Sequence, residues 1–208
     1  MIIKLRLFFK VIIAVCLAQS IAHADATKDL QHFFSDIKSY SASFEQVVLD
    51  ENQGILDQSV GSFWIERPGR FRWEYKTPSE QVIVGTGDEI WIYDVELEQV
   101  THRKSVDAIT QTPAALLAGE GDLDASFQLE DLGRRDELDW VRMLPNNKDS
   151  GFLDIRVGFK NGQLRLLELL DTFDQTTRMR FTGIQENISI PTETFSFTPP
   201  AGIDVVED

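Results

Sequence analysis

The sequence is poor in cysteine and in positive charge. Its 208 residues include one cysteine, Cys16, and 20 Lys and Arg against 34 Asp and Glu, which gives a net charge of −14. A single cysteine cannot form a disulfide within the chain, so packing alone must stabilise the fold. The excess of negative charge argues against nucleic acids as ligands and against simple adsorption to anionic membranes.

The sequence also lacks the common catalytic and metal-binding motifs. It contains no G-x-S-x-G, P-loop or G-x-G-x-x-G motif, and beyond residue 24 its only histidines, His32 and His102, are too far apart for an H-x-x-H metal site. The number of Asp and Glu leaves room for a pair of catalytic carboxylates. However, these acids are spread along polar strand faces and loops, which indicates that they solvate the surface. We therefore expect neither an enzyme nor a metal or other cofactor.

The first 24 residues have the composition of a secretory signal peptide. They contain Lys4, Arg6 and Lys10 but no acid, then an apolar run over 11–18, and they end in Ala22-His23-Ala24. This pattern predicts cleavage after residue 24 and export of a single domain, residues 25–208. A retained membrane anchor is the alternative, but the run is short of the ~20 residues that a span needs. Cleavage leaves 17 Lys and Arg against 34 acids, a net charge of −17, and no cysteine.

Two short helices are predicted in the exported part. Apolar residues at helical spacing predict the first over residues 28–38, with Thr27 as its N-cap; they are Leu30, Phe33, Phe34 and Ile37. The second is predicted over Thr112–Gly119, because Pro at the first position and Gly at the exit are typical helix boundaries. It carries Leu116 and Leu117.

Elsewhere the apolar residues alternate with a period of two, which predicts an antiparallel meander. Asn161-Gly162 is a strong hairpin turn, and Phe195–Pro200 is expected to be the last strand, ended by its prolines. The alternation assigns seven residues to one face, which we call the inner face: Phe63, Ile65, Phe71, Trp73, Tyr75, Trp91 and Tyr93. Trp64, Arg70 and Arg72 fall on the other face by parity.

The aromatic inner face has two interpretations. Aromatic stripes usually form an ordinary core. However, one curved sheet of about ten strands is too wide for two short helices to cover, and rigid rings can line a cavity for an apolar ligand.

A series of short motifs resembles the periplasmic outer-membrane lipoprotein carrier protein family, LolA. No single motif is diagnostic, but the order of the set is specific, and it covers essentially the whole exported chain. The motifs are Arg67-Pro68, Phe71-Arg72-Trp73, Pro78 with Gln81–Val84, Asp88–Asp94, Leu97-Glu98-Gln99, Thr112-Pro113 with Leu116-Leu117, and Phe197–Asp204.

The resemblance implies a fold and a task. The fold would be an unclosed antiparallel β-barrel of about ten or eleven strands, with a helical lid over an apolar cavity. The task would be to accept acylated lipoproteins from an inner-membrane ABC lipoprotein-releasing complex, to carry them through the periplasm, and to pass them to an outer-membrane lipoprotein receptor. Three chains of ~15 methylenes at ~0.8 kcal/mol each cost about 36 kcal/mol to expose to water, so such cargo needs a carrier.

The resemblance also links Arg67 to cargo release. The hypothesis is that Arg67 bonds lid carbonyls when the cavity is empty and that cargo breaks those bonds; alternatively, Arg67 merely solvates a hairpin end. The expected lid and release residues are Arg67, Leu30, Phe33, Phe34, Leu116 and Leu117. A closed lid would hide apolar surface and prevent aggregation.

Two other readings share the fold. The ligand could be a free lipid or a glycolipid. Alternatively, the chain could be the outer-membrane receptor, which should itself be a lipoprotein; however, Val15 precedes Cys16, where lipoprotein signals have Gly, Ala or Ser. After cleavage, we expect the protein to be a soluble, monomeric periplasmic carrier that does not insert stably into a membrane.

Overall fold

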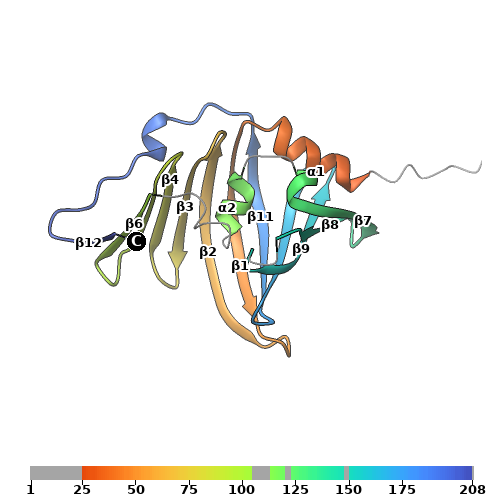
Figure 1. Cartoon of the computed structure of the whole chain (residues 1–208), viewed down its shortest axis with the longest axis horizontal. Coiled ribbons are helices and arrows are strands. Elements are labelled where there is room, and N and C mark those ends of the chain that lie inside the picture. Colours follow the sequence, from red (N-terminus) through yellow and green to blue (C-terminus); the bar gives the residue numbers. More distant parts are fainter. Residues whose placement is uncertain (1–24, 105–112, 120–122, 148–149, 208) are drawn as a thin grey trace, which may run out of the picture.

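The computed structural model describes residues 25–104, 113–119, 123–147 and 150–207, and these residues form one twelve-stranded sheet with short helices (Figure 1). The predicted signal peptide lies outside the described residues. The strands are β1 (Ser39–Leu49), β2 (Ile55–Glu66), β3 (Arg70–Thr77), β4 (Gln81–Thr86), β5 (Ile90–Asp94), β6 (Gln99–Arg103), β7 (Phe127–Arg135), β8 (Leu138–Pro145), β9 (Phe152–Lys160), β10 (Gln163–Asp171), β11 (Thr176–Glu186) and β12 (Asp204–Glu207).

The sheet is curved but not closed. Its order is β12-β6-β5-β4-β3-β2-β1-β11-β10-β9-β8-β7, so that β1 and β11 join two meanders at the centre, and β12 and β7 form separate edges. All neighbours are antiparallel except β12, which pairs in parallel with β6. The predicted unclosed antiparallel architecture is confirmed, with one strand more than the ten or eleven expected.

The hairpin between β9 and β10 follows the sequence prediction. Asn161 and Gly162 both have positive φ, 54° and 78°, as the tight turn between two twisted strands requires.

Helix α1 (Ala26–Ser35) begins two residues earlier and ends earlier than the predicted 28–38. Thr27 is not the N-cap; instead, an Asp25 side-chain oxygen accepts a hydrogen bond from the backbone N–H of Thr27 at 3.2 Å. Aspartate serves this position well, because its carboxylate also complements the positive end of the helix dipole. Leu30 and Phe33 are buried, as is Ile37 just beyond the helix.

Helix α2 (Pro113–Ala118) occupies the second predicted helix, of which Thr112 lies outside the described residues. A further one-turn helix, α3 (Leu123–Ser126), was not predicted. In Figure 1, α2 crosses in front of the central strands and α1 lies along one end of the sheet. Accordingly, α2 packs against β3 and α1 against β7 to β10.

The prediction that Phe195–Pro200 is a strand is wrong. A 3₁₀ helix, η2 (Thr192–Phe195), comes first, and the chain then runs without strand structure to β12. This segment crosses β3 and β4 instead of following a sheet edge, so it has no strand beside it with which to pair. Residues 191–203 thereby cover part of the outer face, where Phe195 is 3% exposed.

No helix within the described part of the chain is both long and apolar enough to cross a membrane.

Candidate functional site

The inner face carries a packed cluster of aromatic rings at the centre of the sheet. Phe63 on β2 lies directly opposite Trp73 on β3, and Ile65 lies opposite Phe71. The Phe63 and Trp73 rings stack with centroids 4.5 Å apart, and Phe44 on β1 lies 4.9 Å from Trp73. These side chains are at most 2% exposed. The centre of the inner face is therefore buried in this structure.

Sequence reasoning did not single out Phe44. Its ring contacts Phe63, Trp73 and Tyr75, so it lies at the centre of the cluster. The signal was present in the alternation of Tyr40, Ala42 and Phe44 along β1, all of which are buried.

Two glycines make room for the rings. A Cβ added at Gly85 would lie 2.2 Å from a ring carbon of Phe71, and one at Gly61 would lie 2.5 Å from a ring carbon of Phe44. Each ring thus occupies the space above a glycine directly opposite it on a neighbouring strand.

Replacing Gly85 with alanine should therefore destabilise the protein by about 1–3 kcal/mol, because Phe71 must leave its position in a packed core. Urea unfolding would measure this loss. Gly87→Ala is a poor control because Gly87 has positive φ, whereas Ser62→Ala, on the outer face, changes a strand residue without adding volume. Equal stability of Gly85→Ala and wild type would contradict the assigned packing.

Tyr75 forms the polar end of the cluster. Its hydroxyl donates to a side-chain oxygen of Gln46 at 3.3 Å. Burial raises the pKa of Tyr75 to about 12, so the hydroxyl is neutral at physiological pH. Burial also raises the pKa of Tyr40, which stacks on Phe63, above its ordinary value. Both tyrosines therefore add no charge to the apolar face.

The assignment of Trp91 and Tyr93 to the inner face is wrong. The register continues from Trp73 to Ile83 and on to Ile92, so the isoleucines share the inner face and Trp91 and Tyr93 point away from it. Both rings instead pack near Phe197, with centroids 5.8 Å and 6.0 Å away. Because segment 191–203 packs on the outer face of β5, that face carries apolar residues as well. The alternation of apolar and polar residues therefore could not distinguish the two faces of this strand.

Arg70 and Arg72 point outward, as parity predicts, and contact the same covering segment. Arg70 lies 5.6 Å from the centroid of the Phe195 ring, and Arg72 donates to the Thr194 carbonyl at 3.5 Å. Trp64 is directly opposite Arg72 in the register and shares its face.

Arg67 is a buried cation that joins the two helical segments. It is 8% exposed and follows β2 directly. One terminal nitrogen, Nη1, donates to the Ile37 carbonyl just beyond α1 at 3.0 Å, and Nη2 donates to the Leu117 carbonyl in α2 at 2.8 Å. The hydrogen bonds to lid carbonyls that the sequence hypothesis requires are thus present.

Aromatic rings of α1 surround the guanidinium of Arg67. Its central carbon lies 5.0 Å from the Phe33 centroid and 5.4 Å from that of Phe34, distances at which a cation is attracted to a ring. Because one side chain binds α1, its exit and α2 at once, Arg67 couples the positions of the two helices.

The remaining predicted lid residues lie against the core. Leu30 and Leu117 are buried, whereas Phe34 and Leu116 are half-buried and pack against the same cluster. The described part of the lid is therefore closed over the inner face.

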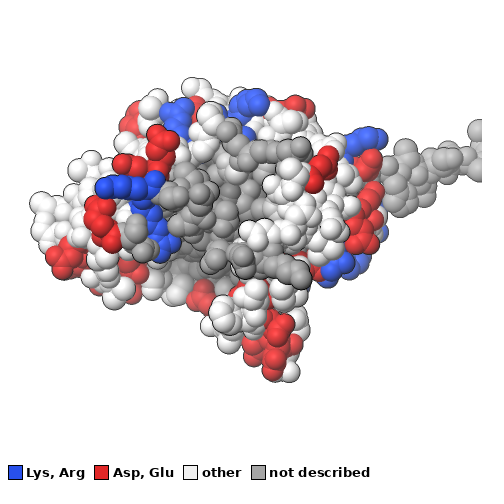
Figure 2. All heavy atoms as spheres, viewed as in Figure 1, with Lys and Arg blue, Asp and Glu red and all other residues white. Residues whose placement is uncertain are grey.

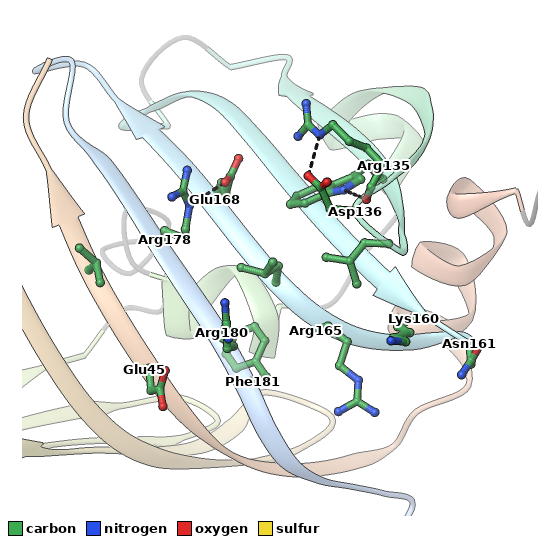
Figure 3. Close-up of a pocket in the computed structure, with 14 residues that line it drawn as sticks. Glu45, Arg135, Asp136, Lys160, Asn161, Arg165, Glu168, Arg178, Arg180 and Phe181 are labelled. Carbon is green, nitrogen blue, oxygen red and sulfur yellow. Dashed lines mark hydrogen bonds and ion pairs between the residues drawn. The ribbon is translucent and has the colours of Figure 1, made fainter. Parts of the chain in front are cut away.

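A groove of about 990 Å³ lies on the outer face (Figure 3). Its walls include Glu45, which lies opposite Arg180 in the strand register, and Arg178, whose guanidinium binds Glu168 at 2.8 Å. Glu45 and Arg180 alternate with the inner-face residues Phe44 and Phe181. The groove mixes such charged side chains with apolar ones, among them Val47, Leu138, Trp140 and Leu166.

Among the described residues, no three His, Cys, Asp or Glu side chains are grouped so that they could hold a metal ion.

Comparisons with known proteins agree on one family. A family model described as outer membrane lipoprotein carrier protein LolA matches residues 35–198. The outer-membrane lipoprotein carrier protein of Dechloromonas aromatica is 44% identical over 205 residues, which cover 98% of this chain and 99% of that protein. The protein of the same name from Nitrosomonas europaea is 40% identical over 204 residues, with coverage of 98% and 99%.

A solved structure agrees at the level of the fold. An uncharacterized conserved protein from Thermus thermophilus matches with a TM-score of 0.58 at 14% identity, covering 89% of this chain and 100% of that one.

Proposed function

Because this chain belongs to the LolA family of outer-membrane lipoprotein carrier proteins, we propose that it is a periplasmic carrier that shields lipoprotein acyl chains against its aromatic inner face. The observation that carries the proposal is the arrangement of that face under two helices joined by one buried arginine. Phe63, Trp73 and Phe44 offer an apolar surface, and the helices above it are held by two side-chain hydrogen bonds.

Cargo binding would require the helices to move. The central rings are buried in this structure, so acyl chains reach them only after the segments packed over them move, α1 and α2 among them. That movement breaks the bonds from Arg67 to Ile37 and Leu117, and those bonds re-form when cargo leaves. The carrier thus exchanges one set of buried contacts for another, which permits both uptake and release.

We further propose the route and the place of this exchange. The carrier works in the periplasm as a monomer after removal of residues 1–24, and it is not an enzyme. It accepts acylated lipoproteins from an inner-membrane ABC lipoprotein-releasing complex and delivers them to an outer-membrane lipoprotein receptor. Its −17 charge after cleavage favours solubility and repels anionic membrane surfaces.

The test is release of lipoproteins from spheroplasts by the purified mature protein. We expect a water-soluble complex of the carrier with a triacylated lipoprotein, identified by mass spectrometry. Spheroplasts depleted of the ABC transporter are the control and should retain their lipoproteins. If spheroplasts that contain a functional transporter retain their lipoproteins, the proposal is overturned. If the complex contains only free lipid or glycolipid, the cargo is that lipid and not a lipoprotein.

A further inference from the structure

Two neighbouring hairpin turns project at the end of the sheet away from Arg67 (Figure 1). The turn between β1 and β2 and the turn between β10 and β11 lie side by side, because β1 and β11 remain paired as far as Leu49 and Thr176. Arg67 follows the opposite end of β2, roughly 35 Å away along a strand of twelve residues. These turns are therefore remote from the lid contacts described above.

The turns expose large apolar side chains. Phe173 is 80% exposed, Ile55 61% and Leu56 54%. Isolated exposed apolar residues are common on protein surfaces, but here three of them lie in or directly beside two adjacent turns. We call these residues and the exposed acids beside them, Glu51, Asp57 and Asp174, the tip surface.

The charge of the tip surface has one sign. Residues 46–61 and 166–177 each contain three Asp or Glu and no Lys or Arg. In Figure 2 the acidic atoms gather at the lower projection, with no basic atoms among them. This charge disfavours contact with an anionic lipid surface, and it favours a partner that presents Lys and Arg.

In each turn, an aspartate side chain fixes the backbone by accepting hydrogen bonds from its N–H groups. One side-chain oxygen of Asp171 accepts from the N–H groups of Phe173 and Gln175, at 2.8 Å and 2.9 Å. Asp50 does the same for Asn52 and Gly54, at 2.8 Å and 2.7 Å. The exposed phenylalanine is thus presented by a turn that is already ordered, which lowers the entropic cost of using it as an anchor.

We propose that the tip surface docks into an apolar pocket rimmed by Lys and Arg on a membrane-anchored protein with which the carrier exchanges cargo. Phe173 fills the pocket, and the surrounding carboxylates bind the basic rim. Docking at this end leaves the contacts of Arg67 free to open. The inference rests on the proposed function, because it assumes exchange of cargo with a membrane protein.

The experiment compares initial rates of two steps: lipoprotein release from spheroplasts, and transfer from a purified carrier–lipoprotein complex to outer membranes. Phe173→Ala removes the anchor. The double variant Glu51→Lys, Asp174→Asn reverses one charge and neutralises the other, with a residue that tolerates the positive φ at position 174. Leu97→Ala and Glu193→Lys are the matched controls: Leu97 is 70% exposed at another hairpin turn, and Glu193 is exposed on η2.

We expect each tip variant to slow at least one step by about tenfold, because truncating an interface anchor commonly costs more than about 1 kcal/mol. The rates of the controls should stay within about twofold of wild type, and raising the salt concentration should slow wild type more than the double variant. Loading with lipoprotein from detergent should be unchanged in all variants, because the inner face is intact.

Three results would overturn the inference. They are unchanged rates in both steps for both tip variants, an equal loss in Leu97→Ala, and Phe173-dependent binding of wild type to protein-free vesicles of phosphatidylethanolamine and phosphatidylglycerol. Failure of wild type itself to release any lipoprotein would instead overturn the proposed function, so the two failures can be told apart.

Discussion

Arg67→Leu should load with lipoprotein but deliver it to outer membranes about 100-fold more slowly than wild type. The guanidinium donates to the Ile37 and Leu117 carbonyls, and hydrogen bonds from charged groups contribute about 1.5–3 kcal/mol each. Loss of both removes at least about 3 kcal/mol that favours the closed, empty state, and each 1.4 kcal/mol is a factor of ten. The loaded state becomes more stable by comparison, so cargo is retained.

The measurement is the initial rate of transfer from a purified carrier–lipoprotein complex to outer membranes. Arg70→Leu is the matched control, because Arg70 lies three residues away but contacts Phe195 on the outer face. It should transfer cargo at the wild-type rate. Normal transfer by Arg67→Leu would show that the arginine only solvates the end of the hairpin.

Trp73→Ala should lower the free energy of unfolding by about 3–5 kcal/mol, the usual cost of removing a large buried aromatic side chain. Trp73 is 1% exposed and packs between Phe63 and Phe44. Since domains of this kind are stable by about 5–15 kcal/mol, this change alone removes a large share of the stability. Urea unfolding of the empty protein measures it.

Trp91→Ala is the comparison, because Trp91 lies on the opposite face and is only half-buried. It should cost less, through the loss of the stacking with His102 at 3.9 Å. A milder pair separates the faces functionally: Trp73→Phe should reduce quenching of tryptophan fluorescence by a brominated acyl chain, and Trp91→Phe should not. If quenching falls in Trp91→Phe but not in Trp73→Phe, Trp91 lies on the face that contacts cargo.

The residue pattern was sufficient where only one face of a strand is apolar. In β3, Phe71 and Trp73 alternate with Arg70, Arg72 and Glu74, so the buried face could be read directly. In β5 the run Ile90-Trp91-Ile92-Tyr93 is apolar at every position, and its parity is ambiguous. That ambiguity has a physical cause, since a distant segment buries the second face as well.

The sequence pattern could not predict contacts between parts of the chain that are far apart in the sequence. The resemblance to a family led to the hypothesis about Arg67, but no local pattern indicates that it contacts Leu117, fifty residues later. The same holds for Gly85, where a Cβ would overlap the Phe71 ring on the neighbouring strand β3.

By itself, the sequence determined the class of fold, the positions of most strands, the central aromatic row and the family to which the chain belongs. These follow from local periodicity, turn residues and ordered motifs, all of which depend on near neighbours. Only the tertiary structure decided which apolar residues share a face, what holds the helices, and which exposed ones meet at the tip. Those outcomes depend on register and on the path of the C-terminal segment, which bring residues together that are far apart in the chain.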